Sequence, residues 1–385
     1  MSGYDVAALR AREFPWLDAD GVAYLNSAST GPTPARTLAA LEAFTRLRAQ
    51  PHRVSHELQF GISARARELF AALVGAGADE IALGPNTSFG VNLAARALPL
   101  RPGDVVVVSD GEFPANVYPW LALERARGVC TRLLPCRDGL PDEDALLAAL
   151  DDPAVRLLAV SWVQFSTGAR ADLARLGRAC RERGVWFVVD AIQGVGAAPL
   201  DVRACRIDVL ACGGQKWLLS PWGTGFAYVR RELIAQLEPP EAGWLSVRGA
   251  EDFTRLTDYD LAWLDDARRF EVGTLPHQDY AAVNESVGLL LELGLDAVGA
   301  HVAALAGRVV DWTLANPGRA RLVTPADAAR RAGIVSVVPT DFAAATRRLR
   351  AADVVFSPRE GMVRLAPHCF NTADDVDTAL RALEG

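Results

Sequence analysis

Between residues 80 and 229 the sequence alternates short apolar runs with stretches of helical periodicity. Runs such as 105–109 and 185–190 are dominated by β-branched and aromatic residues, without the polar alternation of a half-exposed strand. Such strands are typical of a parallel sheet that is buried on both faces. The pattern therefore predicts an α/β fold, with helices on both faces of a mostly parallel sheet. The predicted strands are 80–84, 105–109, 129–134, 155–162, 185–190, 208–212 and 225–229, and the predicted helices are 34–48, 88–98, 114–127, 142–150 and 172–183.

The pattern changes near residue 250. Residues 251–269 are polar and rich in Trp and Asp, as expected of a connection. Beyond them the spacing predicts helices over 279–293, 295–316 and 342–351, strands over 334–339 and 362–366, and a last helix capped by Thr372. We therefore expect a large domain over 17–255, and a smaller α+β domain formed by 1–16 and 256–385.

Composition and charge exclude several classes of function. The 385-residue chain has a net charge of −7 and a pI of about 5.4, which disfavours nucleic acid or an anionic membrane as the main partner. No apolar run reaches the ~20 residues of a membrane span, and residues 1–12 lack the apolar core of a signal peptide. The six cysteines form no CxxC pair, which predicts reduced, mostly buried thiols in a cytoplasmic protein. The histidines show no metal-ligand spacing, so we expect no metal site.

The chain has 40 basic residues, and Lys216 is the only lysine among them. Arginine can replace the charge of a lysine, but it cannot be deprotonated to a nucleophilic amine near neutral pH. A lysine that persists alone is therefore a candidate for amine chemistry, such as a Schiff base. Chance survival in an arginine-rich chain is the alternative.

Lys216 follows the predicted strand 208–212, and Asp190 ends the predicted strand before it. If the two strands are parallel, both side chains lie near the carboxyl edge of the sheet, where open α/β sheets bind ligands. A lysine and an acid at that edge suit pyridoxal phosphate, because the amine can form a Schiff base while the acid pairs with the pyridinium nitrogen. An aspartate that serves only as a cap or an ion-pair partner is the alternative.

Two other cofactor motifs lack their structural context. Gly194 and Gly196 resemble the start of a dinucleotide fingerprint, but Pro199 follows closely and no helix opens there. A P-loop is excluded because Gln215 precedes the lysine and Trp217 follows it. A nicotinamide-dependent oxidoreductase is therefore a weak alternative.

The sequence resembles the class V aminotransferase and cysteine desulfurase-like group of fold-type I pyridoxal phosphate enzymes. The resemblance extends from Tyr24 to Asp377. It implies a large cofactor-binding domain, with a mostly parallel seven-stranded sheet sandwiched by helices, and a smaller α+β C-terminal domain. The segments that carry it are YLNSASTGPTP (24–34), NTSFGVNL (86–93), EFPANVYPW (112–120), DAIQ (190–193), GGQKWL (213–218), FEVGT (270–274) and VRLAPHCFNT (363–372).

The resemblance assigns four residues to the ring of the cofactor. Lys216 matches the Schiff-base lysine, and Asp190 matches the partner of the pyridinium nitrogen. Gln193 matches the residue that hydrogen-bonds the phenolic oxygen, and Phe113 matches the ring that stacks on the cofactor. A core aromatic is the alternative for Phe113.

It also assigns residues to the cofactor phosphate and to the substrate. Thr87 and Ser88 match a phosphate-binding pair at a helix start, where free N–H groups and the helix dipole favour an anion. Thr274 matches a residue that reaches the phosphate of the neighbouring subunit, which implies a homodimer with shared active sites. Arg364 matches the arginine that grips the α-carboxylate of an amino-acid substrate. The residues that border the substrate pocket are expected to include Ala28 and Ser29.

The sequence departs from the family pattern at several positions. Many members carry Ser and His, both in contact with phosphate, where this chain has Gly213 and Gln215. Gln215 could still donate a hydrogen bond to the phosphate. Desulfurases stack a proton-transferring His where this chain has Phe113, and they carry a reactive cysteine on a loop before Arg364, where this chain has none. Cys369 lies after the arginine and is expected to pack in the core, so a persulfide mechanism is disfavoured.

These inferences predict a pyridoxal phosphate enzyme that acts at the α-carbon of an amino acid. The family default is an aminotransferase, and a C–S or β-eliminating lyase, an epimerase or a kynureninase-like hydrolase are the alternatives. A non-catalytic relative is less expected, because it would have no reason to keep its only lysine.

Overall fold

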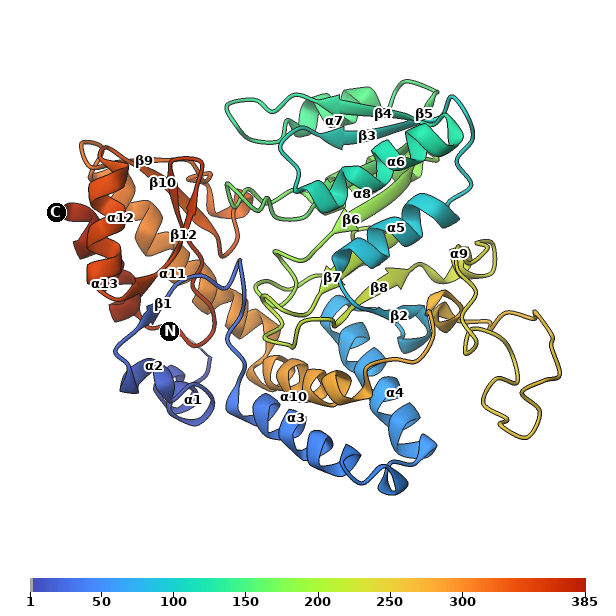
Figure 1. The fold of residues 1–385 in the computed structure, drawn as a ribbon. Coiled ribbons are helices and arrows are strands. Elements are labelled where there is room, and N and C mark those ends of the chain that lie inside the picture. Colours follow the sequence, from blue (N-terminus) through green and yellow to red (C-terminus); the bar gives the residue numbers. More distant parts are fainter. Residues whose placement is uncertain (1–2) are drawn as a thin grey trace.

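The computed structural model of the protein describes residues 3–385, which form a seven-stranded sheet and a four-stranded sheet, each with its own helices, and a separate two-stranded pair (Figure 1). Met1 and Ser2, which belong to the predicted small-domain segment 1–16, lie outside the described residues. The helices are α1 (Val6–Glu13), α2 (Trp16–Ala19), α3 (Ala35–Arg48), α4 (His56–Val74), α5 (Thr87–Ala97), α6 (Tyr118–Arg127), α7 (Glu143–Ala149), α8 (Leu173–Arg183), α9 (Arg231–Ile234), α10 (His277–Leu293), α11 (Leu295–Ala315), α12 (Phe342–Ala351) and α13 (Ala373–Glu384).

The large sheet has seven strands in the order β2-β8-β7-β6-β5-β3-β4. Strand β8 is antiparallel to both of its neighbours, and all the other pairings that lead from β7 to β4 are parallel. The mostly parallel seven-stranded sheet expected from the sequence is therefore confirmed. The strands are β2 (Ile81–Gly84), β3 (Val105–Ser109), β4 (Cys130–Leu134), β5 (Val155–Ser161), β6 (Trp186–Asp190), β7 (Val209–Gly213) and β8 (Gly225–Val229).

Both faces of the large sheet are covered by helices, which explains its unbroken apolar strands. Within β3, Val105 and Val107 point into a core shared with α4, α7, α8 and α10. Val106 and Val108 point to the opposite face and into a core shared with α5 and α6. Because alternate residues of a strand face opposite sides, a sheet with two covered faces needs apolar side chains at every position.

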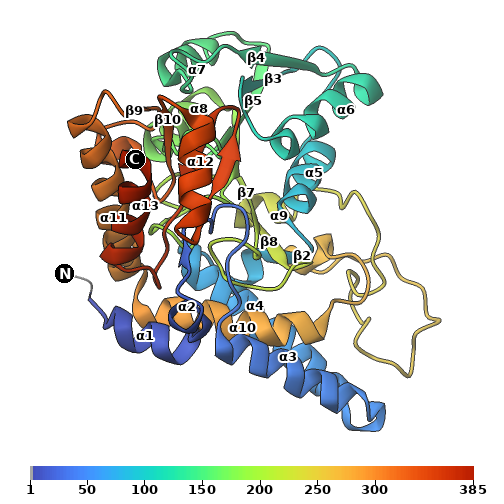
Figure 2. The ribbon, with the colours of Figure 1, turned by 60° about the vertical axis from the view of Figure 1, so that its left-hand side comes forward.

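The small sheet is antiparallel, with strand order β12-β13-β10-β9. Helices α11, α12 and α13 pack together beside it (Figure 2). Its core also includes Ala23 and Leu25, which approach from the N-terminal segment through the parallel pair β1–β11. Its strands and that pair are β1 (Ala23–Tyr24), β9 (Ala320–Leu322), β10 (Val335–Pro339), β11 (Val354–Val355), β12 (Ser357–Arg359) and β13 (Met362–Leu365).

One predicted element is wrong. The single helix expected over 114–127 is a 3-10 turn, Pro114–Asn116, followed after Val117 by α6. Pro119 explains the break, because proline lacks an N–H and is tolerated in the first turn of a helix but not further in. Helix α6 accordingly begins one residue before this proline.

The division of the chain into two domains stays a prediction. Helix α10 lies beside α3 and α4 under the large sheet, whereas α11 continues to the small sheet (Figure 1). Among residues 3–385, no single helix is long and apolar enough to cross a membrane, and α10 and α11 meet that criterion only as a pair bent by 80°. The same residues contain no group of three or more side chains that could hold a metal ion.

Candidate active site

Lys216 and Asp190 lie at the same edge of the large sheet. Strands β6 and β7 are parallel, with Asp190 opposite Ala211, and Lys216 follows three residues after the end of β7. The ammonium of Lys216 lies 5.7 Å from the centroid of the Phe113 ring. The structure therefore brings together three residues that are far apart in the sequence, in the arrangement that the parallel-strand argument predicts.

Burial perturbs both ionisable groups of this pair. It lowers the pKa of Lys216 to about 8, against the opposing effect of Asp190, and the nearby positive charge of Arg364 lowers it further. Burial raises the pKa of Asp190 to about 6, against the hydrogen bond that its Oδ1 accepts from the N–H of Ile192 at 3.0 Å. A lysine with a depressed pKa is available as a neutral amine near physiological pH, which is the state that amine chemistry requires.

The start of helix α5 forms the phosphate end of the candidate site. Asn86 caps the helix by accepting a hydrogen bond from the N–H of Phe89 at 3.0 Å, and Thr87 Oγ1 accepts one from Gly213 N–H at 3.0 Å. The N–H groups of Thr87 and Ser88 are in the first turn, where a helix has no internal acceptor for them. The site thus offers free N–H donors and the positive end of a helix dipole to an anion.

Two departures from the family pattern compensate for each other beside this helix. A Cβ atom on Gly213 would lie 2.5 Å from Gln215 Oε1, so the side chain of Gln215 occupies the space that a serine at position 213 would need. Gln215 Oε1 is buried and has no hydrogen-bond partner. A buried amide without a partner is costly unless a ligand completes its hydrogen bonds. The unpartnered Oε1 accepts a hydrogen bond and so fits a donor on a ligand, whereas a contact with a phosphate would use the amide protons on Nε2 of Gln215.

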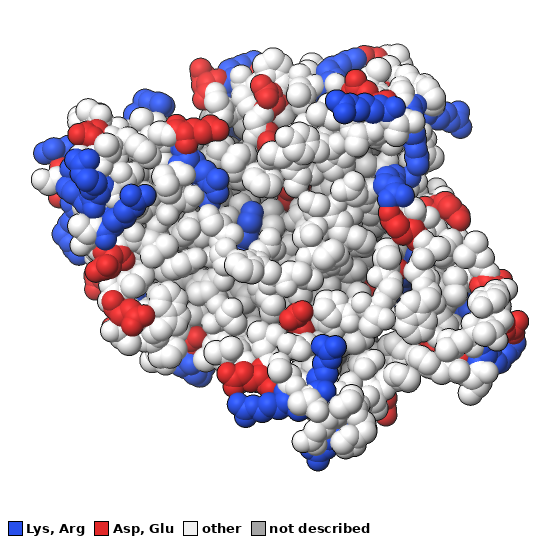
Figure 3. All heavy atoms as spheres, in the orientation of Figure 1, with Lys and Arg blue, Asp and Glu red and all other residues white. Residues whose placement is uncertain are grey.

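Arg364, which the resemblance assigns to the substrate carboxylate, lies on β13. Its guanidinium is 1% exposed, donates from Nη1 to Phe165 O at 2.6 Å and from Nη2 to Ser29 Oγ at 2.8 Å, and leaves Nε without a partner. Within residues 3–385 no carboxylate forms an ion pair with it. Figure 3 shows that most charged side chains of the face in view lie toward its rim, while its centre is largely neutral. A buried, unpaired guanidinium is a site for a carboxylate ligand.

The loop that follows β1 contacts both Gln193 and Arg364. Gln193 Nε2 donates to Ala28 O at 3.0 Å, and Gln193 Oε1 accepts from Trp217 Nε1 at 2.8 Å. One amide proton of Gln193 remains for a ligand, because an NH₂ group has two. The adjacent Ser29 contacts Arg364, so the loop containing Ala28 and Ser29 borders the site as expected from the sequence.

Comparison with known proteins gives a match to the aminotransferase class-V family over residues 23–355. The chain is 31% identical over 385 residues to a probable cysteine desulfurase of Aeropyrum pernix, covering 96% of this chain and 90% of the relative. This chain belongs to the class-V aminotransferase family. The family match bears out the resemblance and, with it, pyridoxal phosphate as the cofactor class.

Solved structures of other proteins share this fold. The apo structure of a cysteine desulfurase from Thermococcus onnurineus NA1 superposes with a TM-score of 0.87 at 23% identity, covering 100% of this chain and 98% of the other. A complex of the cystine C–S lyase C-DES with its product cysteine persulfide superposes with a TM-score of 0.86 at 23% identity, covering 96% and 99%. At these identities the likeness shows the fold, which is that of fold-type I.

One residue that the family resemblance assigns to the cofactor has no hydrogen bond or ion pair with the other assigned residues of this chain. Thr274 is exposed on the segment before α10, and no contact within residues 3–385 joins it to Lys216 or Arg364. The resemblance assigns Thr274 to the neighbouring subunit's site, so a single chain does not test that role.

Sequence reasoning missed Glu112, a fully buried carboxyl group next to the site. It accepts hydrogen bonds from Ser161 N–H at 2.8 Å, from the Ser161 hydroxyl, from Gln164 Nε2 at 2.8 Å and from Asn116 Nδ2 at 3.2 Å. Burial raises its pKa to about 7 despite these donors. Because Phe113 is the next residue, Glu112 anchors the aromatic ring to β5. Only its place in the motif 112–120 could have signalled this role.

Proposed function

We propose that this class-V protein is a pyridoxal phosphate-dependent C–S lyase that eliminates the β-substituent of a sulfur-containing amino acid. The observation that carries the proposal is one buried amine, Lys216, whose pKa responds to the charges of both the acid Asp190 and the guanidinium of Arg364, which has no acidic partner. The names of the relatives favour C–S chemistry over the aminotransferase reading that the sequence suggested first. The lyase, which was one of the alternatives, is therefore the better choice.

Each residue of the site has its own role in this reaction. Arg364 and Ser29 bind the α-carboxylate and fix the amino acid in one orientation. Lys216 Nζ, when neutral, accepts the proton from Cα as general base. When bound, the cofactor supplies the electron sink that makes this proton acidic. The electron pair from Cα then forms the Cα=Cβ bond, the Cβ–S bond breaks, and its pair leaves with sulfur. Water converts the remaining enamine to pyruvate and ammonia.

The sulfur leaves as a product, because neither the turn before Arg364 nor Cys369 offers an accessible thiol to receive it. The turn between β12 and β13 has no cysteine, and Cys369 is fully buried, which raises the pKa of its thiol far above the usual value. A reactive cysteine needs an exposed, electropositive setting. Phe113, at the position of the family's histidine, can position the cofactor but cannot transfer a proton. These features favour elimination over transfer of sulfur to an enzyme cysteine.

We also infer that the protein works as a homodimer that shares its active sites. Exposed apolar side chains include Leu38 (51%), Trp222 (72%), Tyr259 (89%) and Leu261 (66%). Much of the segment 238–266 extends away from the rest of the chain in Figure 1, and its Tyr259 and Leu261 are not covered by their own chain. Exposed apolar surface of this kind is typical of a subunit interface. The cytoplasmic location expected from the cysteines stays a prediction.

The test is to incubate the protein, loaded with pyridoxal phosphate, with L-cysteine and with L-cystine. We expect pyruvate and ammonia in equal amounts, together with sulfide or persulfide. Lys216→Ala should release none of these products, and an exposed-surface variant such as Arg347→Met should behave as the wild type. Keto acid formation without ammonia would instead indicate an aminotransferase. Loss of α-deuterium without net product would indicate an epimerase.

A further inference from the structure

A second arginine shares the face of the small sheet that carries Arg364. In the β12–β13 ladder Ser357 lies opposite Arg364, and Arg359 lies opposite Met362. Side chains two residues apart on a strand, and those directly opposite on its partner, share one face. Arg359 and Arg364 are therefore diagonal neighbours on the same face, and such positions are about 7–8 Å apart.

Arg359 is available to a ligand. Strand β12 is the edge of the small sheet, and Arg359 is exposed. No carboxylate in residues 3–385 forms an ion pair or a hydrogen bond with its guanidinium.

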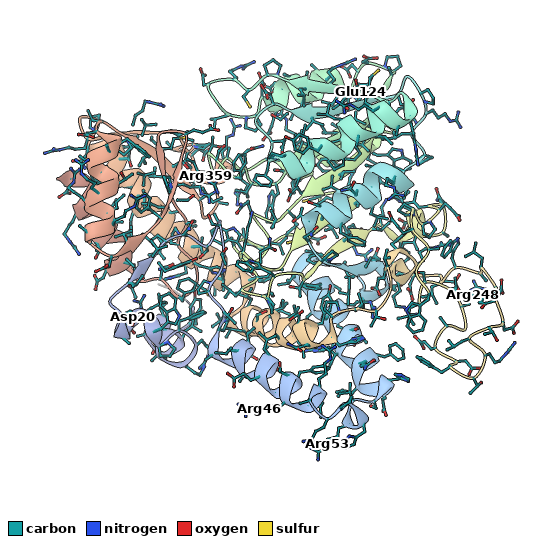
Figure 4. The ribbon with its side chains drawn as sticks, in the orientation of Figure 1. Asp20, Arg46, Arg53, Glu124, Arg248 and Arg359 are labelled. Carbon is teal, nitrogen blue, oxygen red and sulfur yellow. The ribbon has the colours of Figure 1, made fainter. Side chains whose placement is uncertain are left out.

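The charge of Arg359 is directed at the candidate site. Figure 4 shows Arg359 where the small sheet meets the large part of the molecule. After burial, its positive charge is the next contribution to lowering the pKa of Arg364, to about 10, and it also contributes to lowering the pKa of Lys216. The positive charge of Arg359 therefore acts on the site together with that of Arg364.

We propose that Arg359 is a specificity residue that binds an anionic group at the far end of the substrate's side chain, while Arg364 holds the α-carboxylate. The inference rests on the proposed function and names its substrate class: sulfur-containing amino acids whose side chain ends in an anionic group, such as a sulfinate or a disulfide-linked carboxylate. Two neighbouring guanidinium groups repel each other, and each is stabilised when it binds an anion. A substrate with two anionic groups can bind both arginines at once.

A role in the fold alone predicts a different behaviour. A charged residue on an edge strand discourages the addition of a further strand from another molecule. If Arg359 served only that purpose, its replacement would change aggregation but leave the affinity for every amino acid unchanged.

The experiment measures amino-acid binding to the protein loaded with pyridoxal phosphate, from the change in the absorbance of the cofactor and from equilibrium dialysis. The probes are L-aspartate, L-cysteine sulfinate and L-cystine, which carry the second anion, with L-alanine as the neutral reference. The variants are Arg359→Met and Arg359→Lys, and Arg347→Met on α12 is the matched control, because Arg347 is also an exposed arginine of the small domain.

We expect Arg359→Met to weaken binding of the anionic probes by about tenfold or more, because hydrogen bonds to charged groups contribute on that scale. L-Alanine should bind with unchanged affinity, and Arg359→Lys should retain part of the preference. The affinities of L-aspartate, L-cysteine sulfinate and L-cystine then show which anionic group Arg359 binds most tightly. The control variant should match the wild type for every probe.

Two failures of this experiment can be told apart. If all probes bind through Arg364 but Arg359→Met weakens acidic and neutral probes equally or not at all, the specificity proposal is overturned while the proposed function stands. If the loaded protein binds none of the amino acids, the proposed function fails, and the specificity proposal fails with it.

Discussion

At the scale of the residue, the chemistry depends on how burial changes a few side chains. Lys216 and Asp190 have ordinary identities, but removal from water shifts their pKa values toward each other, to about 8 and about 6. Arg364 is buried against the carbonyl of Phe165 with no acid beside it. Each of these states is costly in isolation, and each becomes favourable when a ligand supplies the missing partner.

The pKa of Lys216 predicts how the cofactor-free protein takes up pyridoxal phosphate. Only the neutral amine reacts, so the uptake rate should rise as the pH passes through about 8 and then level off. Rapid-mixing absorbance measurements between pH 6.5 and 9.5, values that span about 1.5 units on either side, would show this. Arg364→Gln removes a nearby positive charge and should move the midpoint to higher pH. A rate that is flat over this range would contradict the assignment.

The same shift has a consequence for stability with a definite sign. In the unfolded chain Lys216 stays protonated up to its ordinary pKa of 10.5, whereas in the folded chain it loses its proton near pH 8. Between these values the unfolded state binds more protons, so the free energy of unfolding of the cofactor-free protein should rise with pH.

At the scale of the element, the site is assembled from strand ends, one helix start and one loop. The loop that follows β1 reaches the site because its backbone packs directly on the residues around Lys216. Gly31 N–H donates to Gln215 O at 2.9 Å, and a Cβ atom on Gly31 would lie 2.0 Å from Lys216 O. Only glycine permits this close approach of two backbones.

Gly31→Ala should therefore separate the loop from the lysine segment. We expect a lower melting temperature and weaker binding of amino acids, because Ser29 would lose its place beside Arg364. Gly61→Ala on α4 is the matched control, since nothing lies within 4 Å of its added Cβ and alanine favours the helix. Thermal unfolding and a binding titration measure both effects. Equal behaviour of the two variants would show that the contact is unimportant.

At the scale of the whole molecule, one chain holds the lysine, the aspartate and both arginines, and it leaves Thr274 exposed. The exposed apolar side chains of 238–266 are likewise without a cover from their own chain (Figure 1). The proposed homodimer would account for both features, with a second copy that covers this surface and receives Thr274 at its own phosphate site.

Light scattering should therefore give twice the 41.2 kDa mass of the chain. Thr274→Ala should leave that mass unchanged but weaken the binding of pyridoxal phosphate, because one hydrogen bond to the phosphate is lost across the interface. A monomer that binds the cofactor with full affinity would exclude the shared site.

The sequence by itself determined the parallel sheet, the family and the identity of the central lysine. These follow from local information: unbroken apolar runs report strands covered on both faces, and a single lysine among arginines is visible without coordinates. The break at Val117 was missed because helical periodicity continues across it, although Pro119 marks the place where the helix must restart.

Only the tertiary structure decided how the remaining groups meet. Glu112 carries no periodic signal, and its burial arises where the segment before α6 meets β5. The compensation between Gly213 and Gln215 is a matter of shared space. The position of Arg359 beside Arg364 depends on the register of one hairpin, and a shift of one residue would turn its side chain to the other face. Contacts between residues distant in sequence are set by packing and register, which no local pattern records.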